Sequence, residues 1–206
     1  MFQIVNLLME NTRPAPPTSA VGPRSPRCHR PLGGSLVISD VHSAEDGHRT
    51  VGEPGACELR VVPAKEQKRG RHVYPMVHSP RGICLIINNH DFGDSKREGS
   101  EHDVRRMRYL FEALHFKCIV HWDLPESEMK KKVEEVAALK EHEVADCLVV
   151  ILMSHGEQNM IYGVDRGKLH LENDIISLFD DENCPALRGK PKVFFIQACR
   201  AMEQKL

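Results

Sequence analysis

The sequence lacks long hydrophobic runs and any strong imbalance of charge. No stretch of about 18 or more apolar residues occurs among its 206 residues, so the sequence predicts no membrane-spanning helix. The formal net charge is −1, which gives no global basic field to attract nucleic acid. The apolar start of the chain has no basic residues before it and no small-residue cleavage site after it, unlike a secretory signal. We therefore expect a cytoplasmic protein without nucleic-acid or membrane partners.

Paired metal-ligand motifs are also missing. The chain contains neither C-x-x-C nor H-E-x-x-H, so no zinc site or other cofactor is expected. Its seven cysteines are odd in number and widely scattered, and four of them lie in segments predicted to be buried. This pattern is typical of reduced thiols in the cytosol rather than of a disulfide framework.

The first 80 residues show little periodic hydrophobicity. The segment 12–26 is rich in Pro and Ser, and such a composition buries too little apolar area to offset the loss of chain entropy. Ser35–Ser39 is an isolated candidate strand. A basic cluster between Lys65 and Arg71 is typical of a solvated linker rather than of a nucleic-acid patch. We predict that residues 1–80 form a disordered or poorly ordered extension.

Four short apolar runs follow in the second part of the chain. They predict buried strands at Cys84–Asn88, Lys117–His121, Cys147–Met153 and Val193–Gln197. Strands separated by helical segments pair in parallel through crossovers, and continuous apolar runs suit a sheet that is covered on both faces. The sequence therefore predicts an α/β domain over residues 81–206, with three layers, a mostly parallel sheet and helices on both faces.

Helical patterns lie between these strands. The first follows a capping-box spacing at Ser100 and Asp103. The second opens at Asp123–Glu126, with Pro125 tolerated in the first turn. A third helix is predicted over Leu171–Phe179, where apolar residues recur at helical spacing.

A histidine and a cysteine follow two of the predicted strands. His155 comes after the third strand and Cys199 after the fourth, so both lie at the carboxyl edge of the sheet, where functional groups gather. An imidazole can take the thiol proton and later protonate a leaving amine. The backbone N–H groups of Gly156 and Cys199 could then stabilise an oxyanion. Taken singly, a cysteine here is usually a small buried residue and a histidine a surface or capping residue.

The sequence motifs around these two residues resemble those of a known protein family. Gln197-Ala-Cys-Arg200, with Ser154-His-Gly156 upstream, resembles the signature of the caspase family, cysteine endopeptidases that cleave after Asp. The resemblance covers about residues 81–200, which is nearly all of a caspase large subunit. It includes segments 84–92, 161–165 and 189–192, while segments 97–103 and 184–191 are somewhat similar to the epidermal-differentiation caspase.

The resemblance implies a role for each matched residue. Cys199 would be the nucleophile, His155 the proton-transfer residue, and the backbone of Gly156 and Cys199 the oxyanion donors. Arg97 would pair with the substrate aspartate, and Gln197 would line the same pocket. A guanidinium fork suits a carboxylate, and a neutral substrate side chain would leave that fork unpaired. Without the resemblance, Arg97 would be taken for a solvated loop residue.

The end of the sequence departs from the family pattern. Ala201 stands where the family has Gly, which leaves the loop geometry after Cys199 open. Residues 201–206 replace the processing site and the small subunit, so we expect a sheet that is incomplete at its C-terminal edge and open to association.

Two hypotheses follow from this departure. The chain is either the large-subunit part of a caspase zymogen in proteolytic signalling such as apoptosis, inactive in isolation, or a truncated non-catalytic homologue that acts as an interaction or dominant-negative regulator. The expected partners are protein substrates with Asp before the scissile bond, and a caspase small subunit or a full-length caspase.

Overall fold

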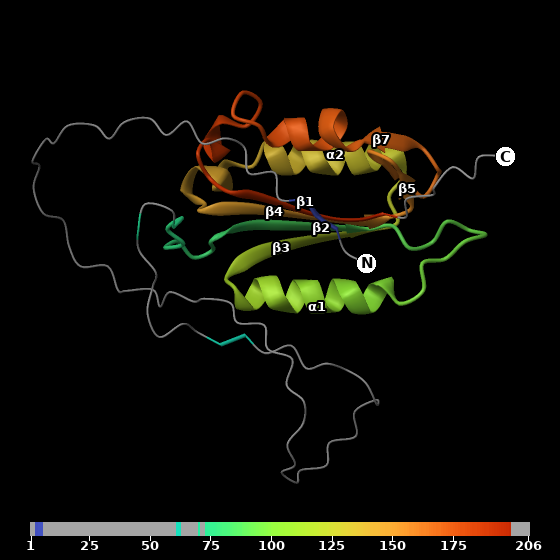
Figure 1. Cartoon of the computed structure of the whole chain (residues 1–206), viewed down its shortest axis with the longest axis horizontal. Coiled ribbons are helices and arrows are strands. Elements are labelled where there is room, and N and C mark those ends of the chain that lie inside the picture. Colours follow the sequence, from blue (N-terminus) through green and yellow to red (C-terminus); the bar gives the residue numbers. More distant parts are fainter. Residues whose placement is uncertain (1–2, 6–60, 63–69, 71–72, 199–206) are drawn as a thin grey trace, which may run out of the picture.

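A five-stranded β-sheet forms the middle layer of the fold (Figure 1). The computed structural model describes residues 3–5, 61–62, 70 and 73–198. The strand order is β1-β8-β4-β2-β3, with bounds β1 Gln3–Val5, β2 Gly82–Asn88, β3 Phe116–Trp122, β4 Cys147–Ser154 and β8 Lys192–Ala198. The last four are the strands predicted from the apolar runs, and they pair in parallel as expected. Every residue of β2 and β4 is buried, which explains their uninterrupted apolar sequences.

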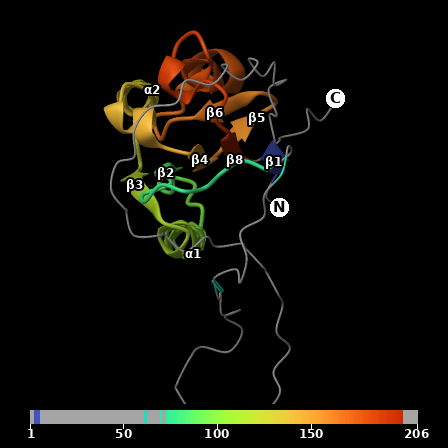
Figure 2. The ribbon, with the colours of Figure 1, turned by 90° about the vertical axis from the view of Figure 1, so that its left-hand side faces the viewer.

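Helices cover both faces of this sheet, as Figure 2 shows in a view turned from that of Figure 1. α1 (Ser100–Ala113) packs on one face and α2 (Glu126–Ala137) on the other. Each interface holds its own hydrophobic cluster, because alternate residues of the strands point to opposite faces. The predicted fold class, a three-layer α/β domain with a mostly parallel sheet, is confirmed.

The start of α1 differs from the prediction. The N-cap is Gly99, at φ 83°, and no side chain caps the helix, so the predicted capping box is wrong. The Ser100 hydroxyl instead accepts a hydrogen bond from Asn88 Nδ2 at 3.0 Å, at the end of β2. A buried amide at the strand end thus uses the hydroxyl that a cap would need. α2 begins one residue after its N-cap, Pro125.

The third predicted helix is confirmed as a helical segment, but an α-helix does not form there. A single π-helical turn, η2 (Leu171–Ile175), and a 3₁₀ turn, η3 (Ile176–Phe179), replace it. The Asp174 carboxylate accepts hydrogen bonds from the His170 backbone N–H at 2.9 Å and from Lys130 Nζ at 3.0 Å. Such side-chain bonds compete with regular helix geometry. Further 3₁₀ turns are η1 (Lys140–Val144) and η4 (Pro185–Leu187).

A small antiparallel sheet lies beside the carboxyl end of β4 and was not predicted. Its strands are β5 (Gly156–Glu157), β6 (Met160–Tyr162) and β7 (Lys168–His170), in the order β5-β6-β7. Strands of two and three residues are too short for a hydrophobic period to reveal them. In Figure 1, β5 and the green loop of residues 89–99 project from the same end of the main sheet.

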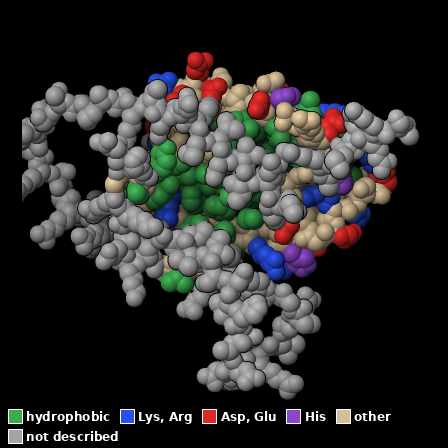
Figure 3. All heavy atoms as spheres, viewed as in Figure 1, with side chains coloured by type: hydrophobic (Ala, Val, Ile, Leu, Met, Phe, Trp, Pro, Cys, Tyr) green, Lys and Arg blue, Asp and Glu red, His purple; other side chains and the backbone are tan. Residues whose placement is uncertain are grey.

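β1 comes from the segment for which disorder was predicted. It pairs antiparallel with β8, from Gln3 opposite Ile196 to Val5 opposite Phe194. Figure 3 views this side of the sheet and shows hydrophobic side chains gathered at its middle. The candidate strand Ser35–Ser39 and the basic cluster lie outside the described residues, so the boundary at residue 80 stays a prediction.

Candidate active site

The register of β4 and β8 brings the two predicted catalytic positions to neighbouring strand ends. Ser154 pairs with Ala198, and the next residues in the sequence are His155 and Cys199. Cys199 itself lies outside the described residues, so its role and that of its backbone N–H stay predictions. The parallel pairing nevertheless confirms that β4 and β8 end at one edge, as the position of the motifs requires.

Gly156 allows the chain after His155 to pass close to the end of β8. A Cβ atom at this position would lie 2.4 Å from the Met160 carbonyl oxygen and 3.0 Å from the Ala198 Cβ. Both distances are too short for a side chain, so glycine is required here by packing. The predicted oxyanion role of the Gly156 N–H is a separate matter and remains a prediction.

His155 lies half-buried against two residues of the loop 89–99, which follows β2. Its ring centroid is 4.6 Å from that of Phe92, and its Nε2 is 3.1 Å from the Ser95 hydroxyl oxygen. Burial lowers the pKa of His155, and the positive charges of Arg97 and Arg166 lower it further, against a smaller opposite effect of Asp94. The imidazole is therefore neutral at neutral pH, which is the form that accepts a proton.

Arg97 joins the loop after β2 to the end of β8. Its Nη2 donates a hydrogen bond to Gln197 Oε1 at 3.0 Å. Its Nη1 donates to Asn88 Oδ1 at 2.9 Å and to the Asn89 carbonyl at 3.1 Å. The structure thus brings together Arg97 and Gln197, the two residues predicted to line one pocket. All three of these acceptors are neutral oxygens, so these bonds orient the guanidinium without cancelling its charge.

Two asparagines at the end of β2 support this arrangement, and no role was predicted for them. Asn88 is fully buried between Arg97 and Ser100. Asn89 donates to the Tyr162 carbonyl at 2.9 Å and accepts from the Leu124 N–H at 3.0 Å. A pair of amides directly after a buried apolar strand must find partners, and that is the sequence signal that could have identified them.

Neither a metal-binding group of side chains nor a membrane-spanning helix occurs among the described residues. They contain no group of three or more His, Cys, Asp or Glu side chains that could hold a metal ion. Within the same residues, no helix is long and apolar enough to cross a membrane.

Comparisons with known proteins identify the family. The model of the family described as "Caspase domain" matches residues 81–206. The chain is 36% identical to Caspase-8 of Mus musculus over 155 residues, which are 70% of this chain and 32% of that protein. It is 40% identical to Caspase-9 of Homo sapiens over 157 residues, 70% of this chain and 37% of that protein. With Caspase-2 of Gallus gallus it shares 39% identity over 134 residues, 63% of this chain and 31% of that protein.

The chain belongs to the caspase family, so the resemblance inferred from its motifs is confirmed at the level of the family. Its homology is thus to cysteine endopeptidases. It spans about a third of the length of these relatives. The finer likeness to the epidermal-differentiation caspase stays a prediction.

Proposed function

We propose that this chain supplies the catalytic large-subunit part of a cysteine endopeptidase that cleaves proteins after Asp, in proteolytic signalling such as apoptosis. The observation that carries the proposal is the position of Arg97. Its guanidinium is held by Asn88 and Gln197 at the edge of the sheet where β4 and β8 end and His155 begins the next segment.

Substrate selection would rest on this arginine. A guanidinium fixed by neutral acceptors binds a carboxylate with two parallel hydrogen bonds. The Gln197 amide, bonded to Arg97 through its oxygen, adds an N–H₂ group to the same pocket. A substrate Asn of similar size offers the guanidinium a single neutral oxygen in place of a carboxylate, and we expect it to be rejected.

The chemical step would use His155 and Cys199. The Cys199 thiol gives its proton to the imidazole, and the sulfur attacks the backbone carbonyl carbon of the substrate Asp. The backbone N–H groups of Gly156 and Cys199 stabilise the oxyanion, and His155 returns the proton to the leaving amine. Water then hydrolyses the thioester and releases the new carboxyl end.

Ser95 would act as a positioning residue for the imidazole. Its hydroxyl lies within hydrogen-bond distance of His155 Nε2, at 3.1 Å. An imidazole bonded at Nε2 has Nδ1 left for the Cys199 thiol. The contact with the tilted Phe92 ring, at an interplanar angle of 57°, restricts rotation of the imidazole further.

The partner we propose is a caspase small subunit or a full-length caspase, bound at the β8 side of the sheet. β1 pairs with three residues of β8, from Phe194 to Ile196. Hydrophobic side chains gather on this side (Figure 3). An incompletely paired edge beside apolar side chains favours strand addition. The same observation supports the second candidate function, a regulator that pairs with a full-length caspase without cleaving substrates.

A cleavage assay with matched peptides tests the first function. The chain is assayed alone and mixed with the small subunit of human Caspase-9, on a peptide with Asp before the scissile bond and on the same peptide with Asn. We expect cleavage in the mixture, with a preference for Asp of ~10³ or more. Cys199→Ala should abolish it. Equal cleavage of both peptides would contradict the role of Arg97.

Co-purification separates the two functions. If neither preparation cleaves the Asp peptide while the chain co-purifies with a full-length caspase and slows it, the regulator is the correct function. Absence of co-purification, together with cleavage in the mixture, rejects the regulator.

A further inference from the structure

Three free cysteines lie together under α1, on the face of the sheet shared by β2, β3 and β4. They are Cys84, Cys118 and Cys147, and all three belong to the hydrophobic cluster between the sheet and α1. The proposed mechanism uses none of them. Their positions along the strands differ: Cys84 pairs directly with Cys118, whereas Cys147 pairs with Gly82.

The pairing of Cys84 with Cys118 satisfies the backbone requirement of a disulfide. Neighbouring strands lie about 4.8 Å apart, and disulfides join residues whose Cα atoms are about 4.4–6.8 Å apart. Residues directly opposite each other project to the same face of a sheet, and both side chains pack in the same cluster. Cys147 is two positions out of register with Cys84, so the same bridge to β4 would require the strands to slide.

The two sulfur atoms already interact and differ in reactivity. A hydrogen bond between them lowers the pKa of Cys118 and raises that of Cys84, whose burial raises it further. Cys118 is half-buried, while Cys84 is fully buried. The more accessible sulfur of such a pair is the one that oxidants reach first, and a thiol beside it can resolve the product. Burial raises the pKa of the third cysteine, Cys147, to about 12.

We propose that Cys84 and Cys118 are a redox pair that closes to a disulfide when the protein meets a peroxide. The Cys118 thiolate attacks one peroxide oxygen, which gives Cys118 sulfenic acid and releases hydroxide. The Cys84 sulfur then attacks the Cys118 sulfur and expels a second hydroxide, and the Cys84 proton combines with it. In total, two thiols and one hydrogen peroxide give one disulfide and two waters, so the sulfurs are oxidised and the peroxide is reduced.

The bridge would act on the outer strand of the sheet. β3 is the edge strand beside β2, and β2 ends at Asn88, which holds Arg97. A link between β2 and β3 therefore ties the sheet edge to the strand that supports the candidate active site. Thiol reductants would reopen such a bond by thiol–disulfide exchange.

Mass spectrometry of the oxidised chain tests the pair. The purified full chain, with the cysteines outside the described residues (Cys28, Cys57 and Cys199) replaced by Ser, is treated with hydrogen peroxide and digested with trypsin without reduction. We expect a linked peptide containing Cys84 and Cys118, which dithiothreitol separates. Its yield should exceed that of any peptide linked through Cys147 by about tenfold or more, because only the first pair is in register.

Matched variants and a second measurement complete the test. Cys118→Ser should remove the linked peptide, whereas Cys147→Ser, on the same face of the sheet, should keep it. Alkylation with iodoacetamide after unfolding in urea checks this in the unmodified chain without any substitution: earlier treatment with peroxide should protect Cys84 and Cys118 together. The proposal is overturned if Cys118 is oxidised to the sulfinic acid while Cys84 remains a free thiol that iodoacetamide alkylates. It is also overturned if peptides linked through Cys147 form in equal yield.

Discussion

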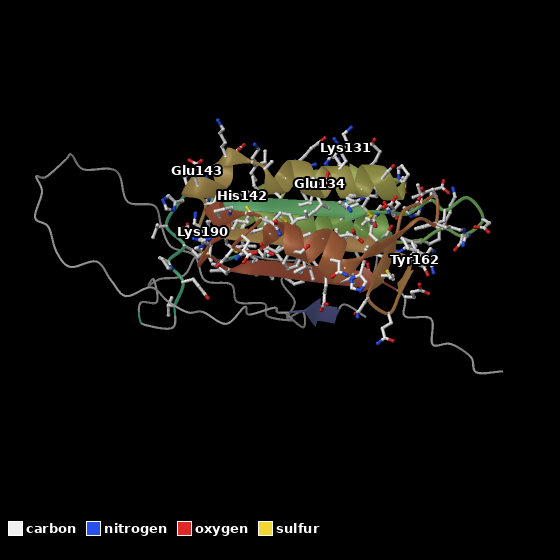
Figure 4. All side chains as sticks on the ribbon, turned by 90° about the horizontal axis from the view of Figure 1, so that it is seen from above. Lys131, Glu134, His142, Glu143, Tyr162 and Lys190 are labelled. Atoms are coloured by element: carbon white, nitrogen blue, oxygen red, sulfur yellow. The ribbon has the colours of Figure 1, made fainter. Side chains whose placement is uncertain are left out.

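The two ends of the sheet each hold a histidine with a lowered pKa. Comparing them distinguishes a structural histidine from one proposed to take part in catalysis. His155 lies at the carboxyl end. His142 lies at the opposite end, where Figure 4 shows it with Glu143 and Lys190, far from Tyr162 at the other end. Burial is the main cause of the lowered pKa in both cases. A lowered pKa therefore does not identify an active site by itself.

The surroundings of the two imidazoles differ. His142 is fully buried, and its Nε2 donates to the Val136 carbonyl at 2.7 Å. Its Nδ1 has no hydrogen-bond partner among the described residues. His155 is half-buried, contacts a hydroxyl through Nε2 and directly follows β4 beside the end of β8. The first imidazole is fully buried, and the second is partly exposed to solvent.

The largest expected effect is on cleavage. Replacing the proposed proton-transfer residue in His155→Gln should lower kcat/KM on the Asp peptide by ~10²–10⁴, the usual contribution of general acid–base catalysis. Its free energy of unfolding should change by less than about 0.5 kcal/mol, as at other partly exposed positions. The control is His142→Gln, assayed where it is folded. An equal loss of cleavage in both variants would erase the distinction between the two histidines.

The arginine should affect selectivity next. Arg97→Lys keeps the charge but loses the fork, so the preference for Asp over Asn should fall by ~10-fold or more. Kinetics on the two peptides measure this ratio. Arg166→Lys is the matched control, because Arg166 forms its ion pair with Asp94 on the exposed surface. A ratio that is unchanged in Arg97→Lys contradicts the proposed pocket.

The effects of the two substitutions on stability should have the opposite order, with the larger loss in His142→Gln. His142→Gln should lower the free energy of unfolding by about 1–3 kcal/mol, because the buried Val136 carbonyl loses the imidazole N–H that donates to it. Urea denaturation of both glutamine variants gives the comparison. A larger loss in His155→Gln than in His142→Gln would show that the carboxyl end, and not the opposite end, is the structural one.

The smallest effect is a pH dependence of stability. A histidine in the unfolded chain takes up a proton near pH 6.5, but burial delays this uptake in folded His142 to lower pH. Between these two pKa values the unfolded state binds more protons. The free energy of unfolding therefore falls as the pH drops below about 6.5, by up to about 1.4 kcal/mol per pH unit for each such group.

His121 and His155 also have lowered pKa values and contribute in the same pH range. Denaturation at several pH values should give a shallower slope for His142→Gln than for the unmodified chain. Identical slopes would mean that His142 is protonated equally in both states.

Local hydrophobic pattern explains which elements the sequence could predict. β2 and β4 are buried along their whole length, so an apolar run was sufficient to place them. Ser100 failed as a cap because its partner, Asn88, is brought to it by the tertiary fold. The helix predicted over Leu171–Phe179 forms as π and 3₁₀ turns, where the Asp174 carboxylate bonds to the His170 backbone N–H and to Lys130 on another element.

In the candidate site too, some residues could be predicted from the sequence and others could not. His155, Arg97 and Gln197 were predicted from motifs, and the structure brings Arg97 and Gln197 into contact. Ser95 was not predicted, since its contact with His155 joins two loops that are distant in the sequence. Polar contacts of this kind depend on the packed fold and leave no periodic signal.

The most direct test of the account is the reactivity of Cys199 itself. Its alkylation by iodoacetamide at pH 7 can be followed by mass spectrometry in the unmodified chain, in His155→Gln and in His142→Gln. If His155 takes the thiol proton, the substitution His155→Gln should slow alkylation of Cys199 by about tenfold, and His142→Gln should leave the rate unchanged. Equal rates in the unmodified chain and in His155→Gln would contradict the claim that the two strand ends form one catalytic pair.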